Sequence, residues 1–301
     1  MNIQTRGIVY GVISAVSYGM NPLFALFLYQ DGLRVDSVLF YRYLLAVLML
    51  GLMMRVRGDS FSLKKSEITP LAILGFLFAA SSFCLFSSFH YIEAGIASTL
   101  LFVYPIMVAV IMAFFFKERI SWGTAFSILL SIVGILLLYK RKDGTALNMT
   151  GVGLVLLSSL SYAIYIVAVN RSVLRDMPSF KLTFYVLLFC VGAILLYSGV
   201  TPGIQLLTSS KMWFIAVSLA LIPTVISLVT MVLSVHYIGS TPTAILGALE
   251  PVTALFFGVV IFGEELTLRI VCGILLIILS VILIILGKSL QQRLRSYLRK
   301  I

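Results

Sequence analysis

The chain has 301 residues, of which 61% are hydrophobic and 11% charged, and its formal net charge is +11. Soluble proteins carry roughly 25% charged residues, so this composition, with a mean hydropathy of +1.12, excludes an ordinary soluble globular domain. The basic residues cluster between apolar segments, as they do in membrane proteins. This pattern favours a lipid bilayer over nucleic acid as the partner of the positive charge.

Ten apolar segments follow one another along the chain, each about long enough to cross some 30 Å of hydrocarbon as a helix. They cover residues 7–28, 36–54, 70–90, 96–116, 121–139, 150–170, 180–199, 211–235, 241–262 and 268–287. Membrane barrels show short segments of alternating polarity instead. The sequence therefore predicts an all-α integral membrane protein with ten transmembrane helices.

The basic residues between these segments predict the orientation of the chain. With both termini in the cytoplasm, fifteen Lys and Arg residues fall in cytoplasmic segments and six in external ones, although the run Lys140–Lys142 is external. Cytoplasmic segments of membrane proteins carry such an excess. We therefore predict a multi-pass protein of the plasma (inner) membrane with cytoplasmic N- and C-termini.

The second half of the chain repeats the first. His90-Tyr91-Ile92 recurs 146 residues later as His236-Tyr237-Ile238, and the same offset relates Tyr104-Pro105 to Glu250-Pro251. Earlier in each half the offset is 144. It relates Gly7, Ser14, Ser17, Tyr18 and Phe40-Tyr41 to Gly151, Ser158, Ser161, Tyr162 and Phe184-Tyr185.

The repeat divides the chain into residues 1–145 and 146–288, followed by a basic cytoplasmic tail over 289–301. Each repeat holds five segments, and because five is odd the second repeat enters the membrane from the opposite side. The sequence thus predicts two inverted five-helix repeats. Transporters built in this way bind their substrate near the middle of the bilayer, between the repeats.

Several short patterns occur once in each repeat. The fourth segment has a proline near its middle (Pro105, Pro251), an acidic residue follows it (Glu118, Glu264), and the fifth segment carries a glycine (Gly134, Gly273). In this order they resemble the EamA repeat of the drug/metabolite transporter superfamily, over about residues 6–288. The resemblance implies ten helices, cytoplasmic termini and transport of small organic solutes, often export of amino acids or other metabolites.

A polar stripe runs along the first segment. Ser14, Ser17, Tyr18 and Asn21 share one helical face, and Ser158, Ser161, Tyr162 and Tyr165 repeat it. Lipid cannot satisfy such groups, so they face protein or water. Small residues also mediate close helix packing. We expect the serines, Ser14 and Ser158 among them, to serve either role, and the tyrosines and Asn21 to line a central cavity. Further tyrosines expected in that lining are Tyr104, Tyr41 and Tyr185.

Glu250 lies near the middle of its segment, where an ionised side chain costs several kcal/mol and marks a functional candidate. It could stand ionised against a cationic or zwitterionic substrate, take up a coupling proton, or be a structural carboxyl. Its counterpart in the first repeat is Tyr104, so the acid occurs in one repeat only.

Arg42 is the one basic residue well inside a segment, and its counterpart is Val186. Its planar guanidinium could bind a substrate carboxylate. It could equally extend towards the outer interface, or pair with Glu250.

Four prolines interrupt apolar segments: Pro22, Pro105, Pro223 and Pro251. In a continuous helix each leaves the carbonyl four residues earlier without its donor. Each is a candidate static kink or a bending point for gating.

The paired histidines do not indicate a metal site. Inversion places His90 near the outer face and His236 near the inner face, so we expect hydrogen bonds at helix ends, and neither a metal nor a cofactor. Inversion separates Glu118 and Glu264 in the same way. We expect each to cap the next helix or to pair with Lys117, Arg119 or Arg269.

The leading hypothesis is an alternating-access carrier for a small metabolite, exporting it if the resemblance holds. No G-x-x-x-x-G-K-[ST] loop for ATP occurs in the sequence, so an ion gradient, a proton gradient among them, or the substrate's own gradient would drive transport. The alternative is a polytopic membrane enzyme acting on lipid-linked substrates. The sequence leaves open a monomer or a homodimer.

Overall fold

The structure, a computed structural model, describes residues 3–117, 122–138, 147–200 and 202–298. All regular elements in these residues are helical. In the first repeat they are α1 Ile3–Gly19, α2 Asn21–Gln30, α3 Val35–Arg57, α4 Lys65–Ser88, α5 Ala94–Leu101, α6 Tyr104–Phe116 and α7 Trp122–Leu138.

The second repeat has the same five spans but divides them differently: its first span is a single helix, and its third span contains a π-helical segment. Its elements are α8 Met149–Arg171, α9 Ser179–Ser198, α10 Ser210–Ala220, the π-helical segment η1 Leu221–Ile226, α11 Ser227–Ile238, α12 Ser240–Leu246, α13 Leu249–Phe262 and α14 Leu268–Leu298. Where a span is broken, its two pieces together cross the bundle: α1 with α2, α5 with α6, α10 to α11, and α12 with α13.

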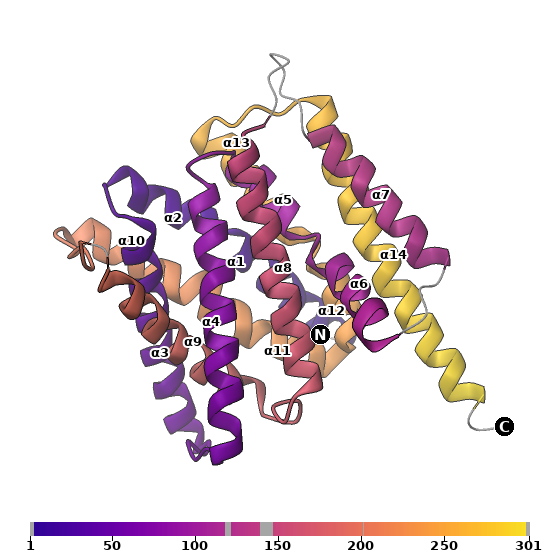
Figure 1. Ribbon diagram of the computed structural model, residues 1–301, viewed down its shortest axis with the longest axis horizontal. Helices are drawn as coiled ribbons and strands as arrows, with labels where there is room; N and C mark the ends of the chain where they lie inside the picture. Colours follow the sequence, from indigo (N-terminus) through magenta and orange to yellow (C-terminus); the bar gives the residue numbers. More distant parts are fainter. Residues whose placement is uncertain (1–2, 118–121, 139–146, 201, 299–301) are drawn as a thin grey trace.

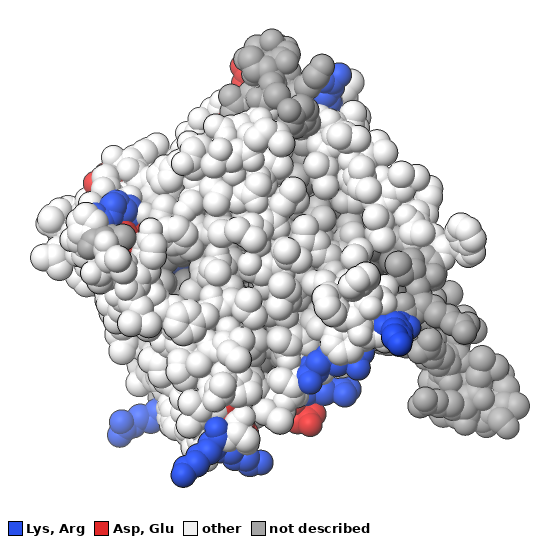
Figure 2. Space-filling model, in the orientation of Figure 1, with Lys and Arg blue, Asp and Glu red and all other residues white. Residues whose placement is uncertain are grey.

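Ten spans result, as the hydropathy pattern predicts. Eight helical segments are long and apolar enough to cross a membrane, and two shorter apolar helices, Ala125–Leu138 and Leu268–Leu283, lie in the fifth and tenth spans. Charged residues lie at the rims of the face shown in Figure 2, and the band between them is uncharged. The ten-helix membrane fold is therefore confirmed.

The two repeats interlock through equivalent pairs of helices. α1 packs against α11, and α4 packs in the equivalent way against α8. The hydroxyl of Ser14 donates to the Ser227 carbonyl (2.8 Å), and that of Ser158 donates to the Ser81 carbonyl (2.7 Å). Ser14 and Ser158 are equivalent, as are Ser81 and Ser227, so the same bond is made twice.

Two equivalent glycines let these helices approach. A Cβ at Gly7 would lie 2.4 Å from a methyl of Ile238, and a Cβ at Gly151 would lie 2.8 Å from a methyl of Ile92. The repeated motif Tyr-Ile at 91–92 and 237–238 is therefore a packing surface for the opposite repeat.

The last helices of the two repeats form a separate pair. α7 and α14 lie side by side at one edge of the bundle (Figure 1). Their backbones meet at Gly134 and Gly273, where a Cβ on either residue would lie 2.9 Å from the carbonyl oxygen of the other. The glycine of the fifth span is therefore a close-contact position.

The spans with prolines are not continuous, which differs from the prediction. Pro22, Pro105 and Pro251 each lie in the first turn of a new helix, where a missing N–H is tolerated. Met20, Phe102-Val103 and Gly247-Ala248 form the breaks before these helices. Pro223 lies in η1, a local widening of the helix that is frequent at functional sites.

Candidate functional site

A small cavity lies where the breaks of the first and ninth spans meet. Its volume is about 20 Å³. It is lined by Tyr18, Gly19, Asn21 and Pro22 of the first span, Glu250 and Pro251 of the ninth, Leu85 of α4, Phe89 just after α4, and Ser98 and Leu101 of α5. The cavity thus lies between the repeats and holds no more than about one water-sized molecule.

Gly19 brings the two breaks into backbone contact. A Cβ at this position would lie 2.5 Å from the Glu250 carbonyl oxygen and 2.6 Å from Cβ of Thr253. Any side chain at position 19 would push the two spans apart. The close approach places Asn21 and Glu250 on the walls of one cavity.

Glu250 is the second residue of α13, in the first turn of a half-helix. A carboxylate is stabilised there by the positive end of the helix dipole, which offsets part of the penalty of its depth. No described side chain donates a hydrogen bond to its carboxylate. The phenols of Tyr18 and Tyr104 lie within electrostatic range of it.

Asn21 presents a second acceptor to the same cavity. Its side chain is 4% exposed, and its Oδ1 has no hydrogen-bond partner among the described residues. A buried amide oxygen without a donor costs about 1–3 kcal/mol. Asn21 and Glu250 therefore form an acceptor pole that a donor-bearing ligand or water would satisfy.

Arg42 is buried near Tyr18. It is 4% exposed, its Nε donates to Oγ1 of Thr224 (3.1 Å), and its guanidinium lies over the rings of Tyr43 (5.1 Å) and Phe86 (5.2 Å). Its burial excludes the predicted extension to the interface. Thr224 lies in η1, so the widened turn supplies the acceptor for this arginine.

Arg42 and Glu250 do not form the predicted ion pair. Both residues are described, and no nitrogen–oxygen distance between them is within 4.0 Å. The Tyr18 phenol lies within electrostatic range of both charges. The site therefore has a donor pole at Arg42 and an acceptor pole at Glu250 and Asn21, and Tyr18 lies near both poles.

An aromatic cluster borders the site on the side of the second repeat. Tyr162 meets Tyr104 edge to face (4.8 Å between ring centroids) and stacks on Tyr165 (5.7 Å). Phe78 of α4 contacts both Tyr162 and Tyr165. Tyr162 also lies within electrostatic range of Tyr18 and Glu250, so the tyrosines predicted from both polar stripes come together.

Four other candidate residues make contacts elsewhere. Ser14 and Ser158 form the helix–helix bonds described above. Tyr41 packs edge to face against Trp213 of α10 (5.7 Å), and the Tyr185 hydroxyl donates to the Phe61 carbonyl in the loop before α4. None of the four lines the central cavity.

The paired histidines lie at the ends of the spans. His90 stacks on Tyr29 (4.6 Å) and His236 contacts Tyr237 (5.4 Å). In the described residues no group of three His, Cys, Asp or Glu side chains could hold a metal ion.

Glu264 corrects one prediction. It caps α5 of the other repeat, 170 residues away, instead of the helix that follows it. Its counterpart Glu118, and with it Arg119, lies outside the described residues, as do the basic run at 140–142 and residues 299–301 of the tail.

Three residues of the site escaped the sequence analysis: Gly19, Thr224 and Ser98. Gly19 lies within the polar stripe, between Tyr18 and Asn21, and Thr224 follows an intramembrane proline. A search for small or hydroxyl residues beside stripes and prolines would have found both. Ser98 carries no such signal, because its place on the cavity wall depends on how α5 packs.

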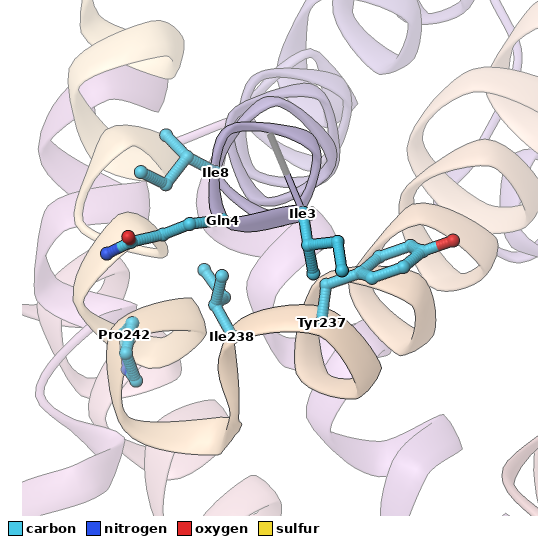
Figure 3. Close-up of a pocket in the computed structure, with 6 residues that line it drawn as sticks. All are labelled: Ile3, Gln4, Ile8, Tyr237, Ile238 and Pro242. Carbon is cyan, nitrogen blue, oxygen red and sulfur yellow. The ribbon is translucent and has the colours of Figure 1, made fainter. Parts of the chain in front are cut away.

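A second pocket, of about 440 Å³, lies away from the central cavity, at the end of the bundle where α1 begins. Figure 3 shows Gln4 and Ile8 of α1 beside Ile238, the last residue of α11, and Pro242 of α12. It lies where the N-terminus of α1 begins, and its lining is mostly apolar.

Comparison with known proteins gives concordant matches. The EamA-like transporter family matches residues 5–140 and again 149–286. "Uncharacterized transporter YcbK" of Bacillus subtilis strain 168 is 26% identical over 277 residues, covering 89% of this chain and 88% of its own. An "Uncharacterized transporter" of Archaeoglobus fulgidus is 28% identical over 272 residues, covering 90% and 93%. A crystal structure with 16% identity superimposes with a TM-score of 0.67 over 96% of this chain and 99% of that one, which supports the fold alone.

Proposed function

Because this chain belongs to the EamA-like transporter family, and is a membrane transporter and not an enzyme, we propose that it exports small zwitterionic metabolites such as amino acids or related compounds. Export follows from the resemblance to the family. The membrane enzyme considered from the sequence finds no support, since the relatives are named transporters.

The observation that supports this proposal is that a donor pole at Arg42 and an acceptor pole at Glu250 and Asn21 lie apart, both near Tyr18. A substrate ammonium group is complementary to the Glu250 carboxylate and the unpartnered Asn21 Oδ1. A substrate acidic group is complementary to the buried guanidinium of Arg42, whose planar fork suits a carboxylate. The rings of Tyr162 and Tyr104 offer an apolar surface beside the acceptor pole.

The substrate would bind by alternating access between the repeats. The cavity of about 20 Å³ is too small for a metabolite, so binding requires the helix pieces around it to separate. The breaks before Asn21, Tyr104 and Glu250 are natural positions for that movement, as in other transporters with discontinuous helices. Glu250, empty of substrate, would accept a proton and so couple transport to a proton gradient.

The proposed orientation keeps both termini in the cytoplasm of the plasma (inner) membrane, with the basic tail 289–301 on the anionic leaflet. The loops 89–93 and 263–267 then face outwards. The site lies within a single chain, so a monomer would suffice for transport.

A thermal-shift panel tests the substrate class. Ligands that bind the folded state raise its melting temperature with the logarithm of their saturation. We expect zwitterionic amino acids to stabilise the protein more than matched amines or acids. Glu250→Gln should abolish the shift given by amines, and Arg42→Ala the shift given by acids.

Flux into proteoliposomes then tests transport itself. Hits should show saturable flux in the wild type and none in Glu250→Gln. Stabilisation by neither charged class, together with absent flux across the panel, would contradict the proposal.

A further inference from the structure

The two ends of the bundle differ, although the repeats make them equivalent. We call the end that carries loops 89–93 and 263–267 the Glu264 end. There α5 packs closely against α13. At the opposite end the equivalent pieces are α12 and α6, and in the described residues they make no comparable contact.

The burial of equivalent residues beside these helices also differs between the two ends, and again the Glu264 end is the more tightly packed. At the opposite end, Ile3 and Ile8 line the open pocket of Figure 3 and are 65% and 44% exposed. Their equivalents at the Glu264 end, Leu147 and Val152, are both buried. The structure is therefore closed at the Glu264 end and looser at the opposite end.

One carboxylate bridges the repeats at the closed end. Glu264 Oε1 accepts a hydrogen bond from the backbone N–H of Ala94 (2.6 Å), and Oε2 accepts one from Gly95 (3.1 Å). These are the first two residues of α5, where N–H groups lack partners within the helix. The positive end of the helix dipole adds to the attraction.

Two glycines create the space for this carboxylate. A Cβ at Gly258 would lie 2.2 Å from Glu264 Oε2, and a Cβ at Gly95 would lie 2.9 Å from the same atom. The equivalent positions in the other repeat are Met112 and Thr241. The glycine-lined socket therefore exists at one end only.

We infer that the contact of the Glu264 carboxylate with the N-terminus of α5 is a gate that holds this end closed, and that its release opens the path to the central cavity. Because the opposite end lacks the two glycines, the gate biases the resting protein towards closure at the Glu264 end. This role presupposes the alternating access proposed above. It assigns a conformational function to a residue that lies away from the proposed substrate site.

Two measurements on Glu264→Ala test the gate without any substrate. The first is amide hydrogen exchange of the purified protein over residues 94–101. The second is labelling of Ser98→Cys, on the cavity wall, by a membrane-impermeant maleimide, with Cys84, Cys190 and Cys272 replaced. Labelling is followed in intact cells and in inverted vesicles, so that each face is probed separately.

We expect exchange over 94–101 and labelling from one face to rise on the order of tenfold or more, because the variant loses both backbone hydrogen bonds to the carboxylate. Glu265→Ala removes an exposed neighbouring carboxylate and should change neither. If Glu264→Ala does not fold, Gly95→Ala crowds the same contact and should give the same result.

Unchanged exchange and labelling in folded Glu264→Ala would overturn the gate. So would equal gains from both faces, which indicate general loosening. Opening in this variant, combined with no flux for any metabolite in wild type, would contradict the proposed function and leave the gate standing.

Discussion

The helix–helix contacts between the two repeats are symmetric, whereas the residues of the central site are not. The two repeats make the same contacts where α1 packs against α11 and where α8 packs against α4. Ser14 and Ser158 form equivalent hydrogen bonds there, and Gly7 and Gly151 leave room for equivalent side chains of the other repeat. At the centre the repeats differ, with Glu250 opposite Tyr104 and Arg42 opposite Val186. Symmetric packing lets two conformations share one fold, while the asymmetric residues give the site a fixed polarity.

The largest effect should come from removing the central acid. Glu250→Gln should lower transport of any identified substrate about a hundredfold, since a charge-assisted contact and a proton acceptor are lost together. Tyr104→Phe, at the equivalent position, should lower it only severalfold. Equal losses in initial-rate flux assays would show that the asymmetry of the pair has no functional meaning.

Arg42→Lys tests whether the planar shape of the guanidinium, and not only its charge, contributes to ligand affinity. Lysine keeps the charge but cannot both bond Thr224 and lie flat over Tyr43 and Phe86. Affinity for acidic or zwitterionic ligands should fall about tenfold. The exposed Arg57 provides the control, and Arg57→Lys should bind ligand as the wild type does; matching behaviour of the two variants would argue against a role for Arg42.

Because the helix pairs are equivalent, substitutions at equivalent glycines should destabilise the fold equally. Gly7→Val and Gly151→Val each force a side chain into Ile238 or Ile92, and each should destabilise the fold by about 1–3 kcal/mol. Gly153→Val, whose Cβ would meet nothing within 4 Å, should leave melting unchanged. A clear difference between the first two variants would refute the equivalence of the helix pairs.

A smaller test uses the paired serines. Ser14→Ala and Ser158→Ala each remove one interhelical hydrogen bond, and each should destabilise by about 0.6 kcal/mol. Ser131 is a buried hydroxyl without a partner in the described part of the chain. Ser131→Ala should therefore not destabilise, and melting curves of the three variants would reveal any departure.

The smallest expected effect concerns pH at the Glu264 end. Burial raises the pKa of Glu264, against the lowering effect of its two backbone bonds, and the nearby Glu93 raises it further. A group with a higher pKa in the closed form binds its proton more tightly there. Acid therefore favours closure, and opening increases as the pH rises through this raised pKa.

Amide exchange over 94–101, taken relative to Glu264→Ala at each pH, would measure this dependence. Glu93 faces the same contact from the loop before α5, so Glu93→Gln should shift the midpoint downwards. Exchange that slows as the pH rises would contradict the assigned direction.

Much of the architecture could be read from the sequence, because hydropathy and repetition are local properties. A run of twenty apolar residues spans a bilayer whatever surrounds it, and an odd number of spans in each repeat implies inversion. The mismatched positions Glu250 and Asn21 likewise emerged from aligning the halves, and the structure places both on one cavity. The prolines were recognised, but the breaks before them depend on neighbouring helices that satisfy the freed backbone groups.

What the sequence determined by itself is therefore the ten spans, the inverted repeats, the family and the polar residues that break the symmetry. Only the tertiary structure decided which of those residues meet. It kept Arg42 and Glu250 apart, with Tyr18 within electrostatic range of both, gave Tyr41 and Tyr185 contacts elsewhere, and placed Glu264 against α5. The reason is physical: apolar helix surfaces resemble one another in sequence, and the choice between partners depends on how backbones approach at glycines and at breaks.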